Sequence, residues 1–450
     1  MSVVREPGRA VLNMAAKGAS FAVEKGAQLV LVLAAAPVLG VAAFGRFSFA
    51  ASLGALLAFA TDLGLTTWTT RALAVDPMRD PGRVPRPPAM GSDGQSPSAP
   101  DAFAAQAPAV LGTGLRLRLL ATVPVVLALV GVALAVSAPD LRWAVLALGA
   151  AALARAFLDH ARAVFRAHER LADEGKVNAA TAVAGTLCGL TAMAAGGGGL
   201  RALAVGVMAG TFAGAAYGFA LLGSRYGGWA GPADRALARR MLHEAAPFWF
   251  AGMFTLAYAR GDVVLLQLLS SDAEVGAYRS VGQLVDVAKQ LPALLMLALF
   301  PQLARAAART ASELVPLENF LLGLLLAGGL LAGAILGAAA SPIVGVLFGA
   351  DFARGVPALR LLAPALPLQF VNCGLLHFFV ARDRGALNVS FAGAMVVVNV
   401  AANLVLDGRA GAVGAATATL VTEAALCACC AYALRTLRRE VSASDRRPSP

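Results

Sequence analysis

The feature that most limits the fold of this 450-residue chain is a series of apolar stretches, each about as long as one membrane crossing. A bilayer-spanning helix needs about 20 predominantly apolar residues. Hydrophobic residues make up 58% of the chain and charged residues only 14%, against about 25% charged residues in soluble domains. We therefore predict an all-α, polytopic membrane protein with about 12 transmembrane helices. The predicted spans are residues 18–40, 44–66, 115–136, 141–158, 177–197, 201–223, 245–269, 276–300, 317–340, 358–381, 385–406 and 411–434.

The distribution of positive charge predicts that both chain termini are cytoplasmic. Cytoplasmic loops keep an excess of Lys and Arg, and most of the 37 basic residues fall on the side that holds the N-terminus. The net charge of +11 does not indicate nucleic-acid binding, because the basic residues are scattered between apolar runs instead of gathering on one soluble face. The first apolar run contains Glu24 and Lys25 and lacks a cleavage site, so we expect a retained span.

An internal repeat predicts two halves of six spans each. Gly175-Lys-Val-Asn178 matches Gly385-Ala-Leu-Asn388, and Phe44-Gly-Arg-Phe-Ser-Phe resembles Val275-Gly-Ala-Tyr-Arg-Ser. Both halves would start on the same side of the membrane, as in transporters built from parallel repeats. The predicted units are an N-terminal lobe at 1–230 and a C-terminal lobe at 231–436.

Two further segments have a composition that cannot bury a core. Residues 76–110 are rich in Pro, Ser and Gly, and the last residues, 437–450, are mostly polar. We predict a disordered cytoplasmic loop and a disordered cytoplasmic tail, respectively.

The eighth span carries a polar stripe. Arg279, Gln283, Asp286 and Gln290 are spaced by four, three and four residues, so they share one helical face, with Lys289 beside them. An ionisable side chain near the bilayer centre costs roughly 2.5 to 3.5 kcal/mol and usually faces a protein interior or a water-filled cavity. The stripe therefore predicts a polar cavity.

The seventh span contains two charges of opposite sign. Arg260 lies near its middle and Asp262 follows two residues later. Positions two apart on a helix do not face the same way, so at most one of these side chains joins the cavity stripe.

Enzymatic and metal sites are not indicated. The densest group of ionisable residues, from Asp159 to Glu174, lacks a metal-ligand spacing such as HExxH. The five cysteines lie in apolar segments, where a free thiol behaves as a small hydrophobe. We expect no catalytic residues, no metal and no cofactor.

Four separate stretches, in order along the chain, resemble a known family of membrane proteins. The stretches are Leu39-Gly-Val-Ala-Ala-Phe-Gly-Arg-Phe-Ser-Phe-Ala, Arg260-Gly-Asp through Glu274-Val-Gly-Ala-Tyr-Arg to Phe300-Pro-Gln-Leu, Leu347-Phe-Gly-Ala-Asp-Phe-Ala-Arg-Gly-Val-Pro-Ala-Leu-Arg-Leu-Leu-Ala-Pro, and Asn399-Val-Ala-Ala-Asn-Leu-Val-Leu with the following Gly411 to Glu423. The family that they resemble is the polysaccharide and O-antigen flippase branch of the multidrug/oligosaccharidyl-lipid/polysaccharide exporter superfamily.

This resemblance implies two six-helix lobes around a central cavity, in a multi-pass protein of the bacterial inner membrane. It implies that the protein moves a polyprenyl-diphosphate-linked oligosaccharide to the outer leaflet for synthesis of lipopolysaccharide or exopolysaccharide. Implied partners are the lipid-linked substrate, membrane lipids, a coupling Na⁺ or H⁺, and the polymerase or glycosyltransferases of the same pathway. The long Pro-rich loop departs from the short connection that is usual in the family.

Within this family, basic side chains in the spans are candidates for contact with the diphosphate, because a guanidinium stays protonated and offers a planar fork of donors. Arg260 and Arg279 are the first candidates, followed by Lys25, Arg46 and Lys289, with Gln283 as a neutral neighbour. Three carboxylates, Asp286, Asp262 and Glu24, are candidates for binding a coupling ion. Asp286 could equally be an internal partner of Lys289 that fixes helix packing.

Two other functions remain open. A multidrug-type exporter of small amphipathic cations would favour an acidic, aromatic cavity, whereas a diphosphate favours a basic one. A membrane scaffold that transports nothing could also be built on this fold.

Overall fold

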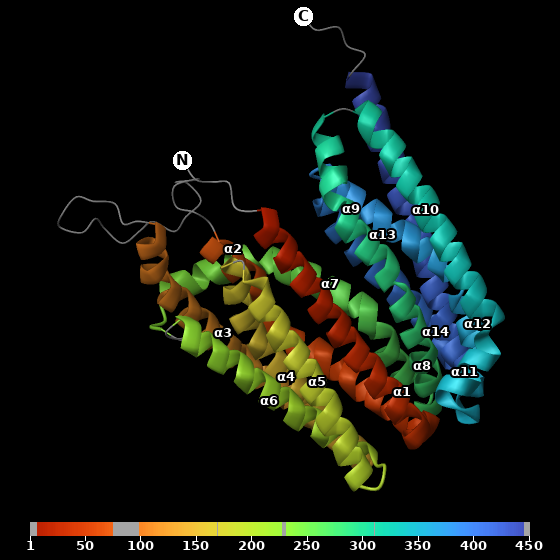
Figure 1. Ribbon diagram of the computed structural model, residues 1–450. Coiled ribbons are helices and arrows are strands. Elements are labelled where there is room, and N and C mark those ends of the chain that lie inside the picture. Colours follow the sequence, from red (N-terminus) through yellow and green to blue (C-terminus); the bar gives the residue numbers. More distant parts are fainter. Residues whose placement is uncertain (1–6, 75–98, 169, 227–230, 310, 445–450) are drawn as a thin grey trace, which may run out of the picture. The chain divides into compact units, whose positions relative to one another are not determined.

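The computed structural model describes residues 7–74, 99–168, 170–226, 231–309 and 311–444, and in these ranges it contains helices and no strands (Figure 1). The helices are α1 (Pro7–Phe59), η1 (Ala60–Asp62), α2 (Leu65–Ala74), α3 (Ala99–Ala135), α4 (Pro139–Ala167), α5 (Leu171–Ala195), α6 (Leu200–Tyr226), α7 (Arg235–Leu269), α8 (Asp272–Ala288), α9 (Gln290–Arg309), α10 (Ala311–Ala338), α11 (Ala340–Phe348), η2 (Ala350–Gly355), α12 (Val356–Leu362), α13 (Ala365–Ala381) and α14 (Ala386–Ser444). The predicted all-α fold is confirmed.

Within the described residues, eight helical stretches are long and apolar enough to cross a membrane, and a bent pair formed by 350–362 and 365–381 is a ninth candidate. Two of the eight, Lys17–Asp62 and Ala386–Arg439, have 46 and 54 residues, which is enough for two crossings each. Helix α7 contains the predicted seventh span. It is not among the eight apolar stretches because its charged residues lower its mean hydropathy. These segments together account for the expectation of about 12 spans.

Each of the two longest helices is interrupted at a glycine. Gly40 in α1 has φ 76° and ψ 165°, and Gly411 in α14 has φ 55° and ψ −131°. A side chain would be strained in either conformation, so both glycines allow a sharp bend. The bends lie at or near the predicted breaks between the first and second spans and between the eleventh and twelfth.

One compact unit consists of residues 1–35 and 50–253. In it, α6 packs against both α4 and α5, and Leu65, Leu158 and Phe165 belong to a fully buried apolar cluster. The Arg118 guanidinium is 1% exposed. It donates to the Asp62 carboxylate at 2.7 Å and to the Ala156 carbonyl at 3.1 Å, so this buried charge is neutralised inside the unit.

The second compact unit consists of residues 36–49 and 254–450. Here α13 packs against α10 and α14, and α8 packs against η2 and α14. The short segment 36–49 approaches α8 so closely that a β-carbon at Gly45 would overlap the Asp272 carbonyl, and one at Gly276 would overlap the Val41 carbonyl. The two glycines that the internal repeat aligned therefore lie against each other.

Several helices run further than the sequence predicted. Helix α3 begins at Ala99, so residues 99–110 of the predicted disordered loop are helical, and residues 75–98 lie outside the described ranges. The alanines that start α3 favour a helix. Helix α14 continues through residue 444 of the predicted disordered tail, and the remaining six residues are not described.

Helix α4 was also expected to be shorter. The sequence interpretation ended the fourth span at residue 158 and assigned Arg155 and the following bases to a cytoplasmic loop. The structure extends α4 to Ala167. The charged residues from Arg155 to Arg166 therefore lie within a helix. Hydropathy alone did not predict this extension, because charged residues lower the mean hydropathy at the end of a span.

Candidate functional site

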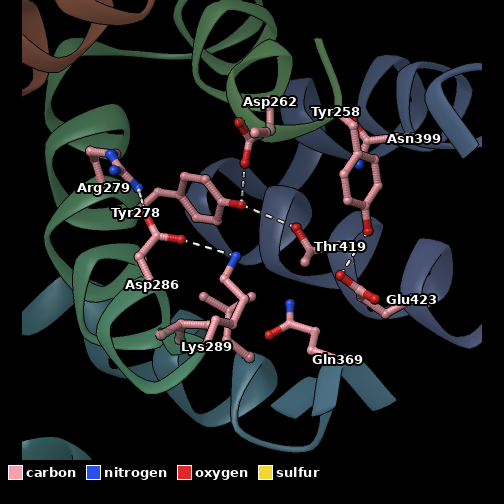
Figure 2. A pocket seen from close by; sticks show the side chains of 14 residues that line it. Tyr258, Asp262, Tyr278, Arg279, Asp286, Lys289, Gln369, Asn399, Thr419 and Glu423 are labelled. Carbon is pink, nitrogen blue, oxygen red and sulfur yellow. Dashed lines mark hydrogen bonds and ion pairs between the residues drawn. The ribbon is translucent and has the colours of Figure 1, made fainter. Parts of the chain in front are cut away.

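A polar pocket lies within the second compact unit (Figure 2). Its walls come from α7, α8, α12, α13 and α14, which are separated in sequence but packed together in this unit. The polar lining residues are Tyr258, Asp262, Tyr278, Arg279, Asp286, Lys289, Gln369, Asn399, Thr419 and Glu423.

Helix α8 supplies the basic wall of the pocket. Ser271 caps its first turn, and its side chain accepts a hydrogen bond from the Glu274 backbone N–H. From there the helical repeat places Arg279 and Asp286 two turns apart on one face, where Arg279 Nη1 donates to Asp286 Oδ2 at 2.9 Å. Lys289 Nζ reaches the other carboxylate oxygen of Asp286 at 3.0 Å. One carboxylate thus holds two bases.

A tyrosine joins α8 to the carboxylate of α7. The Tyr278 hydroxyl donates to Asp262 Oδ2 at 2.6 Å and lies 3.1 Å from the Thr419 hydroxyl of α14. Asp262 Oδ1 accepts from the Val263 backbone N–H at 2.8 Å. In the described part of the chain, Asp262 forms no ion pair, so its hydrogen-bonding donors are all neutral.

Glu423 of α14 is the second carboxylate held by neutral groups. The Tyr258 hydroxyl donates to Glu423 Oε1 at 2.7 Å, and Asn372 Nδ2 of α13 donates to Oε2 at 2.8 Å. The Glu423 residue is 6% exposed. Among the described residues it has no basic partner within 4 Å, which is unusual for an acid at membrane depth.

The pocket has more acids than bases. Asp262, Asp286 and Glu423 face Arg279 and Lys289, so the fully ionised lining carries a net charge of −1. Buried acceptor oxygens on Gln369 and Asn372 have no hydrogen-bond partner in the described structure. Such a lining can accept a proton or a monovalent cation at its carboxylates and an anion at its basic wall. The described residues contain no group of three or more His, Cys, Asp or Glu side chains placed to hold a metal ion.

The structure brings together four of the nine residues predicted from the sequence: Arg279, Lys289, Asp286 and Asp262. Gln283 lies beside them and accepts from Arg279 Nη2 at 3.3 Å. Arg260 is not part of the lining, in keeping with its helical phase relative to Asp262.

Three predicted residues lie elsewhere. Arg46 pairs with Asp272 at 2.5 Å. Lys25, in the first compact unit, lies over the Phe21 ring at 5.6 Å. Glu24 lies in that unit as well.

Sequence reasoning missed Glu423, Tyr258 and Asn372. Glu423 is the one acidic residue in the predicted twelfth span, so the rule that in-span ionisable residues mark functional sites could have found it. Nothing comparable pointed to Tyr258 or Asn372, which are 165 and 51 residues from Glu423. Their role follows from helix packing.

Comparisons with known proteins agree with the resemblance inferred from the sequence. The sequence model of a family described as polysaccharide biosynthesis protein matches residues 109–307. No curated protein matches the chain.

Solved structures show the fold. An inward-facing multidrug resistance MATE family transporter of the MOP superfamily is 14% identical with a TM-score of 0.70, covering 93% of this chain and 95% of that one. The lipid II flippase MurJ in an inward closed conformation is 11% identical with a TM-score of 0.70, covering 94% and 87%. The bent form of the Vibrio cholerae MATE transporter VcmN is 14% identical with a TM-score of 0.54, covering 96% and 98%.

The similar structures confirm the predicted fold class, a multi-pass helical membrane protein of the two-lobe transporter type. Together with the family match, they support a membrane transporter or flippase of this superfamily.

Proposed function

Because the chain resembles the polysaccharide flippase branch of the exporter superfamily, we propose that it moves a polyprenyl-diphosphate-linked oligosaccharide across the bacterial inner membrane. The family match over residues 109–307 is the observation that carries the substrate class. One structure of similar fold is a lipid II flippase, which supports a lipid-linked substrate. The lobes 1–230 and 231–436 would alternate access to the two leaflets, with both termini cytoplasmic. Glycosyltransferases or a polymerase of the same pathway are its expected partners.

The basic wall of the pocket is the proposed contact for the diphosphate in the C-terminal lobe. Arg279 and Lys289 already bind an oxyanion, the Asp286 carboxylate, and phosphate oxygens present the same chemistry to a guanidinium. Gln283 adds a neutral group to this wall. Asp286 keeps both bases oriented, so we assign it to positioning and not to ion coupling. Arg260, Arg46 and Lys25 remain secondary candidates; none of the three is a lining residue of this pocket.

We assign ion coupling to Asp262 and Glu423. Both carboxylates accept hydrogen bonds only from neutral groups in the described structure. A carboxylate at membrane depth without a basic partner is stabilised by taking up a proton or a cation. Transport that is driven by an ion gradient needs such a group. Glu24 is the corresponding candidate in the N-terminal lobe.

A second function is favoured by one observation. The pocket lining has three acids, two bases and two tyrosines, which also suits a small amphipathic cation. In that case the protein would export cations in the manner of a multidrug transporter.

One reconstitution separates these functions. Purified protein in proteoliposomes is supplied with a fluorescent polyprenyl-diphosphate oligosaccharide in one set and with ethidium in another, each with and without a proton or Na⁺ gradient. Gradient-dependent flipping of the lipid supports the proposal, whereas export of ethidium alone supports the second function. Movement of neither would indicate a scaffold. The same assay is run with Arg279→Gln, which removes a proposed diphosphate contact. Its matched control is Arg142→Gln, because Arg142 is exposed and its one hydrogen bond among the described residues goes to the Val136 carbonyl.

A further inference from the structure

Arg155 is a basic residue inside a helix that is a candidate membrane span, whereas the sequence analysis placed it in a loop. It lies on α4, sixteen residues after Pro139, which is about 24 Å along the helix axis. Helix α4 contains an 18-residue window that is apolar enough to make the helix a candidate span. The Arg155 side chain is partly buried.

Arg155 starts a charged stripe along one face of α4. Asp159, Arg162 and Arg166 follow at intervals of four, three and four residues, so the four side chains share a face. Arg162 pairs with Asp159 at 2.8 Å, and Arg166 pairs with Glu174 at 2.7 Å. Two of the three arginines on this face therefore have carboxylate partners.

Arg155 has no such partner in the described part of the chain. Over the ranges that the structure describes, its guanidinium donates no hydrogen bond and lies within 4 Å of no carboxylate. The charged groups within electrostatic range are Glu24 of α1, Asp159 and Arg162. All of these residues belong to the first compact unit.

Two other largely buried arginines among the described residues are satisfied internally. Arg118 binds Asp62, Thr66 and the Ala156 carbonyl, and Arg382 binds Glu318 through two nitrogens. A guanidinium has five donors and stays charged in a protein, so leaving one unbonded at membrane depth is costly. An external anion is the simplest group that would compensate.

We propose that Arg155 is an anion-binding residue of the first compact unit and that it contacts phosphate oxygens of the transported lipid. This inference rests on the proposed function for the source of the phosphate. Glu24 limits how tightly the anion is held, because its negative charge opposes a second one nearby. An arginine with a distant acid can thus bind the substrate and still release it.

The test is a binding measurement that does not depend on transport. The full-length protein is placed in phosphatidylcholine nanodiscs and titrated with geranylgeranyl diphosphate or with neutral geranylgeraniol. Arg155→Gln should weaken diphosphate binding at least tenfold and leave binding of the alcohol unchanged, and Arg155→Lys should restore part of the affinity. The control Arg162→Gln removes a base that already has a carboxylate partner, and its affinity should stay within about twofold of wild type.

Three results would overturn the inference. Wild-type diphosphate affinity in Arg155→Gln would mean that Arg155 has only a structural role. An equal loss for diphosphate and alcohol would indicate damaged packing. The binding measurement is also repeated in phosphatidylglycerol nanodiscs. If this anionic lipid weakens diphosphate binding to wild type but not to Arg155→Gln, the residue binds bulk lipid headgroups instead of substrate. Arg155-dependent diphosphate binding without oligosaccharide flipping would refute the proposed function alone.

Discussion

Glu318 of α10 is the most deeply buried acid with two basic partners in the described structure. The residue is 0% exposed. It accepts from Arg382 Nε at 2.9 Å and Nη2 at 3.0 Å, and from Arg438 Nη2 at 2.8 Å. Arg382 directly follows α13 and Arg438 lies near the end of α14, so one carboxylate joins three helices of the second compact unit.

Glu318→Gln keeps the shape of this side chain and removes its charge. Two guanidinium groups then face a neutral amide, and breaking a buried ion pair by removing one partner costs about 3 to 5 kcal/mol. Arg438 is 24% exposed at its side chain, so water relieves part of its charge. We expect a loss of about 3 kcal/mol, the lower end of that range. This loss corresponds to a change of roughly a hundredfold in the ratio of folded to unfolded protein.

The assay is denaturation of the purified protein in mixed micelles with increasing dodecyl sulfate, compared with Glu313→Gln. Glu313 lies five residues earlier on the same helix, and its pair with Arg309 is 3.4 Å long with side chains 50% and 68% exposed. Such an exposed pair contributes about 0.2 to 1 kcal/mol. If both variants lose the same stability within about 1 kcal/mol, the buried cluster does not contribute the stability expected of a buried ion pair.

Three further predictions concern the pocket and the packing of α8. Arg279→Ala should abolish surface polysaccharide in cells while the protein remains in the membrane. The substitution removes a proposed diphosphate contact and leaves Asp286 with one basic partner. Wild-type amounts of polymer on immunoblots would show that Arg279 is not part of the site. Glu423→Gln keeps the side-chain shape, since the amide oxygen can still accept from Asn372 Nδ2 and the NH2 group can donate to the Tyr258 oxygen. The amide cannot bind a proton or cation as a carboxylate does, so vesicle transport should lose its dependence on the ion gradient. An unchanged dependence would exclude this residue from coupling. Gly276→Ala places a β-carbon on the Val41 carbonyl and should lower the yield of folded protein on size-exclusion chromatography. The control Gly261→Ala adds a β-carbon that meets no atom within 4 Å, and its yield should stay at the wild-type level. Equal yields of the two variants would contradict the close packing at Gly276.

The helical repeat made part of the site predictable. Positions seven residues apart on a helix face the same way, so the spacing of Arg279 and Asp286 was enough to place both on one face. The same reasoning separated Asp262 from Arg260. The apolar runs predicted the spans because a bilayer accepts only segments of that length and composition.

The sequence alone therefore determined the fold class, the approximate number of spans and the polar stripe of the eighth span, since each depends on local composition or on the period of one helix. Only the tertiary structure decided which acidic side chains form ion pairs with basic ones. It paired Asp286 with Arg279 and Lys289, and it surrounded Glu423 with neutral groups from α7 and α13. Among the described residues it also placed no carboxylate within ion-pair distance of Arg155. These outcomes depend on how each helix is rotated and packed against helices far away in the chain, which no local pattern specifies.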